Sequence, residues 1–389
     1  MDAHAPLPAA RRIMEGFARS TGLEGDGPGR RYLWTDAFAV CGFLGLRDAT
    51  GEERWLELAL RLVDRVHHVL GRHRPDDPRE GWLSGLGEEE GERRPTLGGL
   101  RIGKPRPERA LGEPYDLDAE WDRDGQYYHY LTRWMHALVR VWRATGDPVF
   151  HRWAVELAEA AHRAFAHGPG GERRLHWKMS VDLSRPLVPS MGQHDALDGI
   201  VAVGEIRAAS PPEGVGWSWG DARALDEEED DLRAMCREGS WATRDPLGIG
   251  GLLVDALFLA RRVEGGELEE APLVERLLSV SEVSLEAFGR VGELERPARA
   301  RLAFRELGLA LGLAALGTAS DEMGGSRVLP RAELAPVLRY ARLKERINAF
   351  WLDPAHREAP TWRKHRDINE VMLATSLMPG GYLGRVTPR

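Results

Sequence analysis

Apolar residues recur at spacings of three and four along residues 52–70, and charged residues occupy most of the positions between them. This spacing predicts an amphipathic helix with one buried and one solvated face. Residues 148–167 repeat the pattern, and each segment follows a similar turn, Ala-Thr-Gly-Glu at 49–52 and Ala-Thr-Gly-Asp at 144–147. The two matches indicate an internal repeat of a helical unit.

Other segments are apolar on nearly every side, which requires that protein surrounds them. They alternate with the amphipathic segments, and almost nothing in the chain has the pattern of a strand. The predicted inner helices are 35–46, 126–142, 192–206, 247–260, 300–316 and 367–377, and the outer ones are 8–20, 52–70, 148–167, 222–237, 271–288 and 331–350. This alternation predicts an all-α fold, an (α/α)6 toroid of six helical hairpins that forms a single domain over residues 1–389.

Small residues in two of the predicted inner helices bear on how those helices pack. Gly248, Gly250 and Gly251 stand in one helix, and Gly308 and Gly312 stand in another. No strand precedes the Gly-Ile-Gly-Gly stretch, which argues against a phosphate-binding loop. We therefore expect these glycines to allow close approach of inner helices.

The links between the predicted helices are unequal, and the longest runs from residue 71 to residue 125. A simple connector needs far fewer residues, and loops of this length commonly form lids or binding walls. All links from an outer to an inner helix emerge at one end of a toroid. We therefore expect the Trp, His, Asp and Arg residues of these links to converge at one mouth.

Alternating helical hairpins joined by Thr-Gly-Asp or Thr-Gly-Glu turns resemble the six-hairpin glycosidase superfamily. That superfamily includes glycoside hydrolases, unsaturated uronyl hydrolases and the N-acylglucosamine 2-epimerase group. The resemblance covers nearly the whole chain as an architecture, and it implies an activity on carbohydrates. No family's complete catalytic motif is matched, so the site has to be argued from individual residues.

Composition narrows the classes of partner. The 389 residues carry a formal net charge of −8, which argues against recruitment of nucleic acid by bulk electrostatics. No apolar run reaches the length of about 18 residues that a membrane span needs, so no membrane association is expected. With only Cys41 and Cys236, neither a disulfide framework nor a cysteine-rich metal site is available, and we expect a reducing, cytoplasmic location.

Acidic residues stand where two links enter predicted inner helices. Asp124 lies within Glu-Trp-Asp-Arg-Asp-Gly-Gln-Tyr-Tyr-His-Tyr at residues 120–130, and Asp36 stands at the start of the first inner helix. Helix N–H groups and the helix dipole keep such a carboxylate ionised, which suits either capping or catalysis. Uronyl hydrolases place Asp residues at inner-helix starts, and the resemblance to them favours a catalytic role for both.

Two histidines stand at other helix starts. His194 precedes Asp195, and a further Asp four residues on shares its helix face, so a carboxylate could orient the imidazole; a structural histidine fits the same spacing. His365 is followed closely by Asp367 and Glu370 at the start of the last inner helix. The epimerase group uses a His at about this architectural position, so the resemblance implies an acid/base role for His365. The second His of that group has no evident counterpart here.

Aromatic and basic residues of the links supply candidate sugar contacts. Trp rings suit the apolar faces of sugars, although loop packing explains any single Trp equally well. Arg101 and Lys104 could clamp an anionic group. The predicted substrate-binding residues are Trp34, Arg101, Lys104, Trp121, Gln126, Tyr127, His129, Trp177, Trp241 and Trp362.

The leading interpretation is a glycoside hydrolase in which two carboxylates act as acid and as base or nucleophile. Its candidate catalytic residues are Asp36, Asp124, Asp195, Asp367 and Glu370. A sugar epimerase or isomerase using His194 and His365 is the first alternative, and a noncatalytic toroid that binds a glycan or a protein is the second. Either enzyme would act on a small saccharide without a cofactor or a metal, and the sequence sets no oligomeric state.

The hydrolase interpretation leads to an expectation for Asp124→Asn. An amide keeps the capping capacity of the carboxylate but loses its charge and its proton transfer. The variant should therefore lose turnover and fold nearly as the wild type does.

Overall fold

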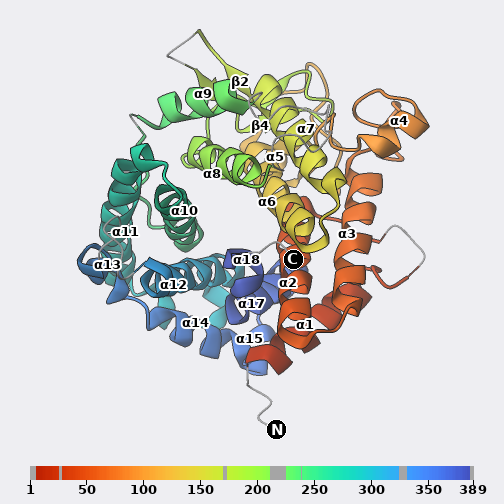
Figure 1. Cartoon of the computed structure of the whole chain (residues 1–389). Helices are drawn as coiled ribbons and strands as arrows, with labels where there is room; N and C mark the ends of the chain where they lie inside the picture. Colours follow the sequence, from red (N-terminus) through yellow and green to blue (C-terminus); the bar gives the residue numbers. More distant parts are fainter. Residues whose placement is uncertain are drawn as a thin grey trace. The chain divides into compact units, whose positions relative to one another are not determined.

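The periodic segments form helices close to the predicted bounds, as a computed structural model of the chain shows (Figure 1). The structure describes residues 6–25, 29–169, 173–210, 225–237, 239–323 and 331–385. The longer helices are α1 (Pro6–Ser20), α2 (Leu33–Thr50), α3 (Arg54–Leu70), α6 (Tyr128–Thr145), α7 (Pro148–Phe165), α8 (Asp195–Ala208), α9 (Asp226–Cys236), α10 (Pro246–Glu264), α11 (Ala271–Val291), α12 (Ala303–Met323), α13 (Arg331–Leu338), α14 (Leu343–Leu352) and α17 (Arg366–Leu377).

Shorter elements fill several of the links. These are the helices α4 (Glu88–Arg93), α5 (Leu117–Asp122), α15 (Pro354–Arg357), α16 (Pro360–Lys364) and α18 (Gly380–Leu383), and the strands β1 (Gln126–Tyr127), β2 (Ala166–His167), β3 (Arg174–Leu175), β4 (Lys178–Met179) and β5 (Pro186–Val188). Of the described helices, none is both long enough and apolar enough to span a bilayer.

Backbone contacts divide the chain into two compact units. The first unit contains residues up to 17, residues 45–52 and residues 240–385, and the second contains residues 18–44 and 53–239. In the first unit α10 packs against α11 and α12, and α12 also packs against α14 and α17. In the second unit α6 packs against α7 and α8, and α8 packs against α9.

Glycines set the close approach of α10 and α12. A Cβ atom on Gly250 would lie 2.1 Å from the carbonyl oxygen of Gly308, and one on Gly312 would lie 2.5 Å from the carbonyl oxygen of Gly250. Real Cβ atoms do not approach backbone this closely, so only glycine fits at the crossing. The predicted packing role is confirmed for these three residues, whereas a Cβ on Gly251 would meet nothing within 4 Å.

The two similar turns also share their geometry. Gly51 and Gly146 have φ of 72° and 71°, in the left-handed region that glycine adopts readily. The hydroxyl of Thr50 donates to the carbonyl of Leu46, and that of Thr145 donates to the carbonyl four residues before it. The internal repeat predicted from sequence is therefore visible in the hydrogen bonds that end α2 and α6.

Two features of the fold differ from the prediction. Strands β1, β4 and β5 form an antiparallel sheet, and β2 pairs with β3, although the sequence indicated almost no strand. Strands of two or three residues are too short to show an alternating pattern. The outer helix expected over residues 331–350 is instead divided into α13, which contains Pro336, and α14. The start of the helix expected over 222–237 lies outside the described residues before 225.

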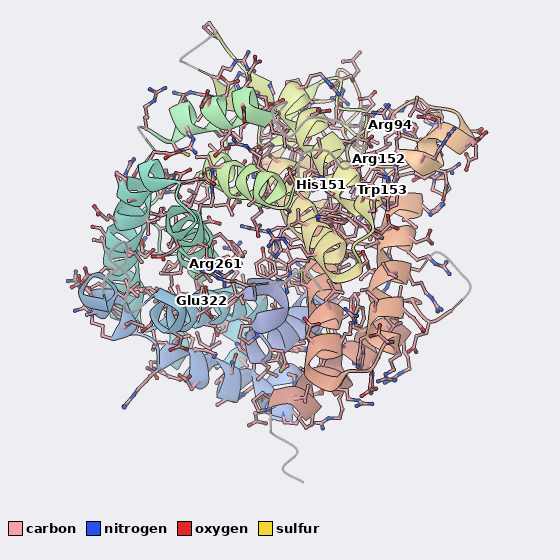
Figure 2. The ribbon with its side chains drawn as sticks, viewed as in Figure 1. Arg94, His151, Arg152, Trp153, Arg261 and Glu322 are labelled. Carbon is pink, nitrogen blue, oxygen red and sulfur yellow. The ribbon has the colours of Figure 1, made fainter. Side chains whose placement is uncertain are left out.

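Polar side chains tie neighbouring elements together within each unit. Arg152 and the indole of Trp153, on α7, both donate to the carbonyl of Arg93 at the end of α4, while Arg94 pairs with Glu156 (Figure 2). In the other unit Arg261 of α10 and Glu322 of α12 form an ion pair at 2.8 Å. Arg93 and Arg94 stand at the end of α4, and Arg261 and Glu322 stand near the ends of α10 and α12.

We expect Gly250→Ala to destabilise the protein by about 1–3 kcal/mol, the usual cost of overpacking a tight contact. Gly251→Ala is a matched control one residue away, because its Cβ enters open space and Ala forms helix better than Gly. Urea unfolding of both variants measures the difference. Equal stabilities would show that α10 and α12 do not depend on this contact.

Candidate functional site

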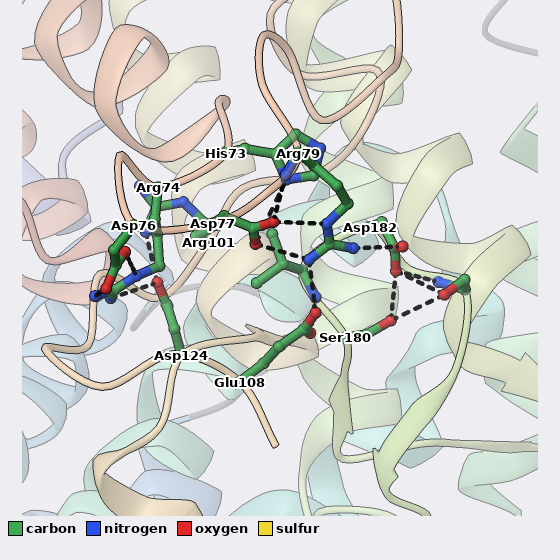
Figure 3. Close-up of polar contacts among 12 residues, drawn as sticks. His73, Arg74, Asp76, Asp77, Arg79, Arg101, Glu108, Asp124, Ser180 and Asp182 are labelled. Carbon is green, nitrogen blue, oxygen red and sulfur yellow. Dashed lines mark hydrogen bonds and ion pairs between the residues drawn. The ribbon is translucent and has the colours of Figure 1, made fainter. Parts of the chain in front are cut away.

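Asp124 fixes the end of the long link to the segment around residue 101. Its side chain is fully buried, and its carboxylate accepts hydrogen bonds from Arg101 Nη1 at 2.5 Å and from the backbone N–H groups of Gly103 and Lys104. Arg74 Nη1 lies 3.6 Å from the same carboxylate (Figure 3). A carboxylate so fully occupied by the protein holds the loop in place.

Arg79 anchors another part of this link. Its guanidinium pairs with Asp77, Glu108 and Asp182, at 2.8, 2.8 and 2.7 Å (Figure 3). Burial raises the pKa of Asp182, but hydrogen bonds from Ser184 and Ser180 and the charge of Arg79 outweigh it and lower that pKa to about 2. The long link is therefore held against the turn between β4 and β5 by ionised groups.

A second buried ion pair, Lys178 with Glu120, lies close to the start of α6. Lys178 Nζ is buried and donates to the carboxylate of Glu120 at 3.2 Å and to the backbone carbonyls of Glu120 and Arg123. Burial lowers the pKa of Lys178, and the charge of Glu120 opposes that shift. The same ammonium group lies 5.4 Å from the ring centroid of Tyr127. The Lys178–Glu120 pair therefore lies against the Tyr127 ring.

Six aromatic side chains meet in the second unit, and we call them the aromatic cluster: Tyr32, Trp121, Tyr127, His129, Tyr130 and Trp177. Ring centroids of Tyr127 lie 5.4 Å from His129, 5.2 Å from Tyr130 and 5.0 Å from Trp177. The ring centroids of Trp121 and Trp177 are 5.0 Å apart, and Trp121 is 46% exposed. The cluster thus runs from a buried ring to the surface.

Phenol groups add polar atoms to the aromatic cluster. The hydroxyls of Tyr32 and Tyr130 share a hydrogen bond of 2.6 Å, which connects the segment before α2 to the start of α6. The buried Tyr127 hydroxyl has no hydrogen-bond partner among the described residues. Burial raises the pKa values of Tyr127 and Tyr130, so both phenols stay protonated and can donate hydrogen bonds at neutral pH.

A histidine and a carboxylate stand side by side at the edge of the cluster. His129 Nδ1 lies 3.4 Å from Asp195 Oδ1, and the His129 side chain is 26% exposed while that of Asp195 is buried. Asp195 also accepts a hydrogen bond from the backbone N–H of Gly192. The buried carboxylate is thus fixed by the segment that precedes α8, and it lies beside an imidazole that solvent reaches. The approach is that of an ion pair without a hydrogen bond, because the buried Nδ1 has no hydrogen-bond partner among the described residues; it becomes attractive when the imidazole is protonated.

Within the second unit, three predicted helix starts converge as expected. Tyr32 precedes α2, His129 lies in the first turn of α6, and Asp195 begins α8. The contacts Tyr32–Tyr130 and His129–Asp195 join these starts. Lys104, a predicted clamp, lies with its ammonium group 5.3 Å from the Tyr32 ring centroid.

The other predicted carboxylates have protein partners or a helix-start position. Asp36 is buried and accepts from the backbone N–H of Tyr32, with Arg31 at 3.4 Å. Glu370 pairs with Arg366 at 2.8 Å. Asp367 lies in the first turn of α17. For Asp36, as for Asp124, these contacts are what a structural carboxylate makes.

Several predicted sugar contacts are buried among protein atoms. The Gln126 amide accepts from Leu100 N–H and donates to the carbonyls of Gly98 and Val181, which satisfies the whole group. The guanidinium of Arg101 donates its hydrogen bonds to Asp124 and to backbone carbonyls. The indoles of Trp34, Trp241 and Trp362 are also buried. These side chains therefore have the burial of packing residues. A sugar could touch them only if the protein atoms that cover them moved away.

His194 and His365 each stand just before a helix, α8 and α17 respectively. Both are partly exposed. The His365 ring lies 5.7 Å from the ring of Phe304 at the start of α12. Both histidines therefore occupy the helix-start positions that the sequence predicted for them.

Asp64, His68 and Glu92 form one of the groups of described side chains that have the spacing of a metal site. His68 Nε2 lies 2.8 Å from Glu92, and Nδ1 lies 2.9 Å from the backbone carbonyl of Asp64. Burial lowers the pKa of His68, but the Asp64 carbonyl and the charges of Asp64 and Glu92 outweigh it and raise that pKa. The three side chains thus contact one another at the surface, with the imidazole between the two carboxylates.

Sequence reasoning did not select Tyr32, Tyr130 and Lys178 as residues of the site. The two tyrosines stand in the helix-start segments that were already singled out, so their proximity to His129 and Trp34 in sequence was the available signal. Lys178 directly follows Trp177, which the sequence singled out, but its pairing with Glu120 joins residues far apart along the chain and had no signal.

No protein-family model matches the chain, and no curated protein sequence matches it. The structure is similar to the crystal structure of a sugar epimerase from a ruminal bacterium, with a TM-score of 0.51. The match covers 95% of this chain and 98% of that chain at 10% sequence identity. Structural similarity at 10% sequence identity shows the fold alone. The predicted all-α class, an (α/α)6 toroid, is confirmed, and no individual family within it is shown.

The contacts of Asp124 reverse the expectation drawn from sequence for Asp124→Asn. An amide leaves the charge of buried Arg101 uncompensated, and breaking a buried ion pair in this way costs about 3–5 kcal/mol. Asp122→Asn is the matched control, because Asp122 is exposed on the same segment and its loss should cost less than about 0.5 kcal/mol. Thermal and urea unfolding test both variants. An Asp124→Asn protein as stable as wild type would refute the structural role.

Proposed function

We propose that this protein is a carbohydrate-active enzyme that moves a proton beside the carbonyl of a sugar, as an epimerase or isomerase. The observation that carries the proposal is the His129–Asp195 pair at the edge of the aromatic cluster. Shared fold with a sugar epimerase supports it in addition. Fold alone does not give function, so the chemistry of the pair is the main argument.

In this proposal the aromatic cluster binds the sugar. The half-exposed Trp121 and the neighbouring Trp177 offer a stacking surface to the apolar face of a pyranose, and the paired hydroxyls of the partly exposed Tyr32 and Tyr130 offer polar groups to its hydroxyls. A ring-opened sugar would place its carbonyl-adjacent C–H near His129. The exposed imidazole edge then removes that proton, and the enediolate receives a proton at the same or the neighbouring carbon.

Asp195 acts as a positioning residue in this proposal. Its carboxylate lies 3.4 Å from Nδ1 of His129, and in this proposal it stabilises the imidazolium that forms when Nε2 takes the substrate proton. His194 stands next to Asp195 in sequence, and it remains a second candidate base. His365 remains a candidate as well, because its helix-start position matches the one that the resemblance to the epimerase group implies.

The hydrolase interpretation has less support in the second unit. A glycosidase needs two carboxylates available to substrate on either side of the scissile bond. Asp36 and Asp124 are buried and bonded to protein, and Asp195 is buried beside His129. The epimerase alternative is therefore the one that the geometry favours, and hydrolysis is an outcome that the experiment can detect.

We expect His129→Gln to lower kcat by about 10²- to 10⁴-fold, the usual contribution of a general base, with little change in melting temperature. Wild-type protein is incubated with free aldoses, ketoses and reducing disaccharides in deuterated water. Mass spectrometry and NMR then follow deuterium at the carbon beside the carbonyl. His68→Gln is the control histidine, and His194→Gln and His365→Gln test the other candidate bases.

Three outcomes would contradict this assignment. Release of sugars from glycosides without deuterium exchange would favour a hydrolase. Sugar binding without any turnover would favour a binding protein. Full activity of His129→Gln, with loss in His194→Gln or His365→Gln, would move the base to another residue.

We expect Trp121→Ala to raise KM about fivefold with kcat nearly unchanged, since stacking contributes about 1 kcal/mol to binding at an exposed ring. Leu111→Ala is the control, because Leu111 is the more exposed apolar residue of the same link and lies outside the aromatic cluster. Steady-state kinetics on the substrate found above separates the two parameters. An unchanged KM would remove Trp121 from the sugar-binding surface.

A further inference from the structure

An aspartate, a histidine and a glutamate come together where α4 of the long link meets α3. Asp64 and His68 stand four residues apart on α3 and so share one helix face, while Glu92 comes from α4. One possible ligand atom of each side chain lies within 4.8 Å of those of the other two. Atoms that bind one Zn²⁺ lie about 2.1 Å from it, and hence within about 4 Å of one another. Small side-chain rotations would therefore bring all three onto one ion.

The hydrogen bonds of His68 suit a metal ligand. Nδ1 lies 2.9 Å from the backbone carbonyl of Asp64, and Nε2 lies 2.8 Å from the Glu92 carboxylate. A carbonyl only accepts, so Nδ1 carries the proton and a neutral ring has its lone pair on Nε2. Histidines that bind metals are commonly oriented by such a carbonyl. Since Nε2 and Glu92 would then be two facing acceptors, their approach requires a second proton or a cation between them.

The two carboxylates of this group have the imidazole as their ion-pair partner. Among the described residues, neither Asp64 nor Glu92 is paired with an arginine or a lysine, and each is paired with His68. By contrast, Glu88 and Glu89 on the same short helix pair with arginines. Two carboxylates that share one imidazole carry more negative than positive charge. A divalent cation bound between them would balance it.

A cavity beside the three side chains leaves room for the other ligands of a metal ion. It measures about 130 Å³, and all three residues belong to its lining. A water molecule occupies about 30 Å³, so several fit. Trp82 also lines the cavity, and its buried indole N–H has no hydrogen-bond partner among the described residues. A water molecule on the metal would give that donor an acceptor, which a buried N–H group otherwise lacks at a cost in free energy.

We propose that Asp64, His68 and Glu92 bind one Zn²⁺ ion, which holds α4 of the long link to α3. Imidazole and carboxylate groups both bind Zn²⁺, and three protein ligands with water in the open position form a common zinc site. Mg²⁺ keeps most of its water and prefers oxygen ligands, so it binds this set weakly. The site is structural and shares no residue with the aromatic cluster, so catalysis does not depend on its metal.

Isothermal titration calorimetry of the full chain, first freed of metal with a chelator, tests the proposal with Zn²⁺ and with Mg²⁺. We expect wild type to bind Zn²⁺ with a Kd in the micromolar range, at least a hundredfold more tightly than Mg²⁺. The ligand variants His68→Gln, Asp64→Asn and Glu92→Gln should each weaken Zn²⁺ binding at least tenfold, because each removes one of three ligands. Glu89→Gln is the matched control, since Glu89 lies on α4 as Glu92 does and its side chain is 90% exposed.

Melting temperatures separate loss of binding from loss of folding. The three ligand side chains are at least partly exposed, so the metal-free variants should melt close to the metal-free wild type. Zn²⁺ should raise the melting temperature of wild type and of Glu89→Gln, because an ion that binds only the folded state stabilises it. It should leave the melting temperatures of the ligand variants unchanged.

Unchanged Zn²⁺ binding in any of the three ligand variants would overturn the proposal. The absence of Zn²⁺ binding to wild type would do so as well, and Mg²⁺ binding of equal strength would contradict the choice of ion. No sugar is present in these measurements, so their outcome is independent of the proposed epimerase activity.

Discussion

The buried ion pair between Asp124 and Arg101 is the interaction on which the arrangement of the second unit depends. It joins the end of a link of more than fifty residues to the segment around residue 101. Arg101 also donates to the carbonyls of Val69 and Arg72, so the end of α3 is held by the same side chain. Charges buried in this way are costly unless every partner is in place, which makes the loop's position an all-or-none property.

The position of the aromatic cluster depends on the segment that the Asp124–Arg101 pair holds. The backbone of Ile102 bonds to Leu33 N–H and to the carbonyl of Gly125, so the anchored segment lies between the start of α2 and the entry to α6. Tyr32 and Tyr130 meet beside it, and Lys104 reaches the Tyr32 ring. The long link thus works as a scaffold for the proposed sugar-binding surface. The paired Lys178 and Glu120 lie against the Tyr127 ring of that surface.

Polar residues serve different ends in the two units. In the second unit the buried charges are compensated, and the proposed chemistry rests on an imidazole at the edge of the buried network. In the first unit the Nη2 of Arg357 donates to the carbonyl of Leu352, while its buried Nε lacks a hydrogen-bond partner among the described residues. A compensated group stabilises the fold, whereas a buried donor without a partner costs free energy.

The sequence by itself determined the helical class, the order of the helices, the repeated Thr-Gly turns and the glycines that allow inner helices to approach closely. These features depend on periodicity and on backbone conformation, which are local properties of a chain. It also placed His129 and Asp195 at helix starts. Only the tertiary structure decided that Asp124 and Gln126 are occupied by protein partners, and that His129 faces Asp195. Those outcomes depend on residues far apart in sequence, such as Arg101 for Asp124, whose meeting no local pattern encodes.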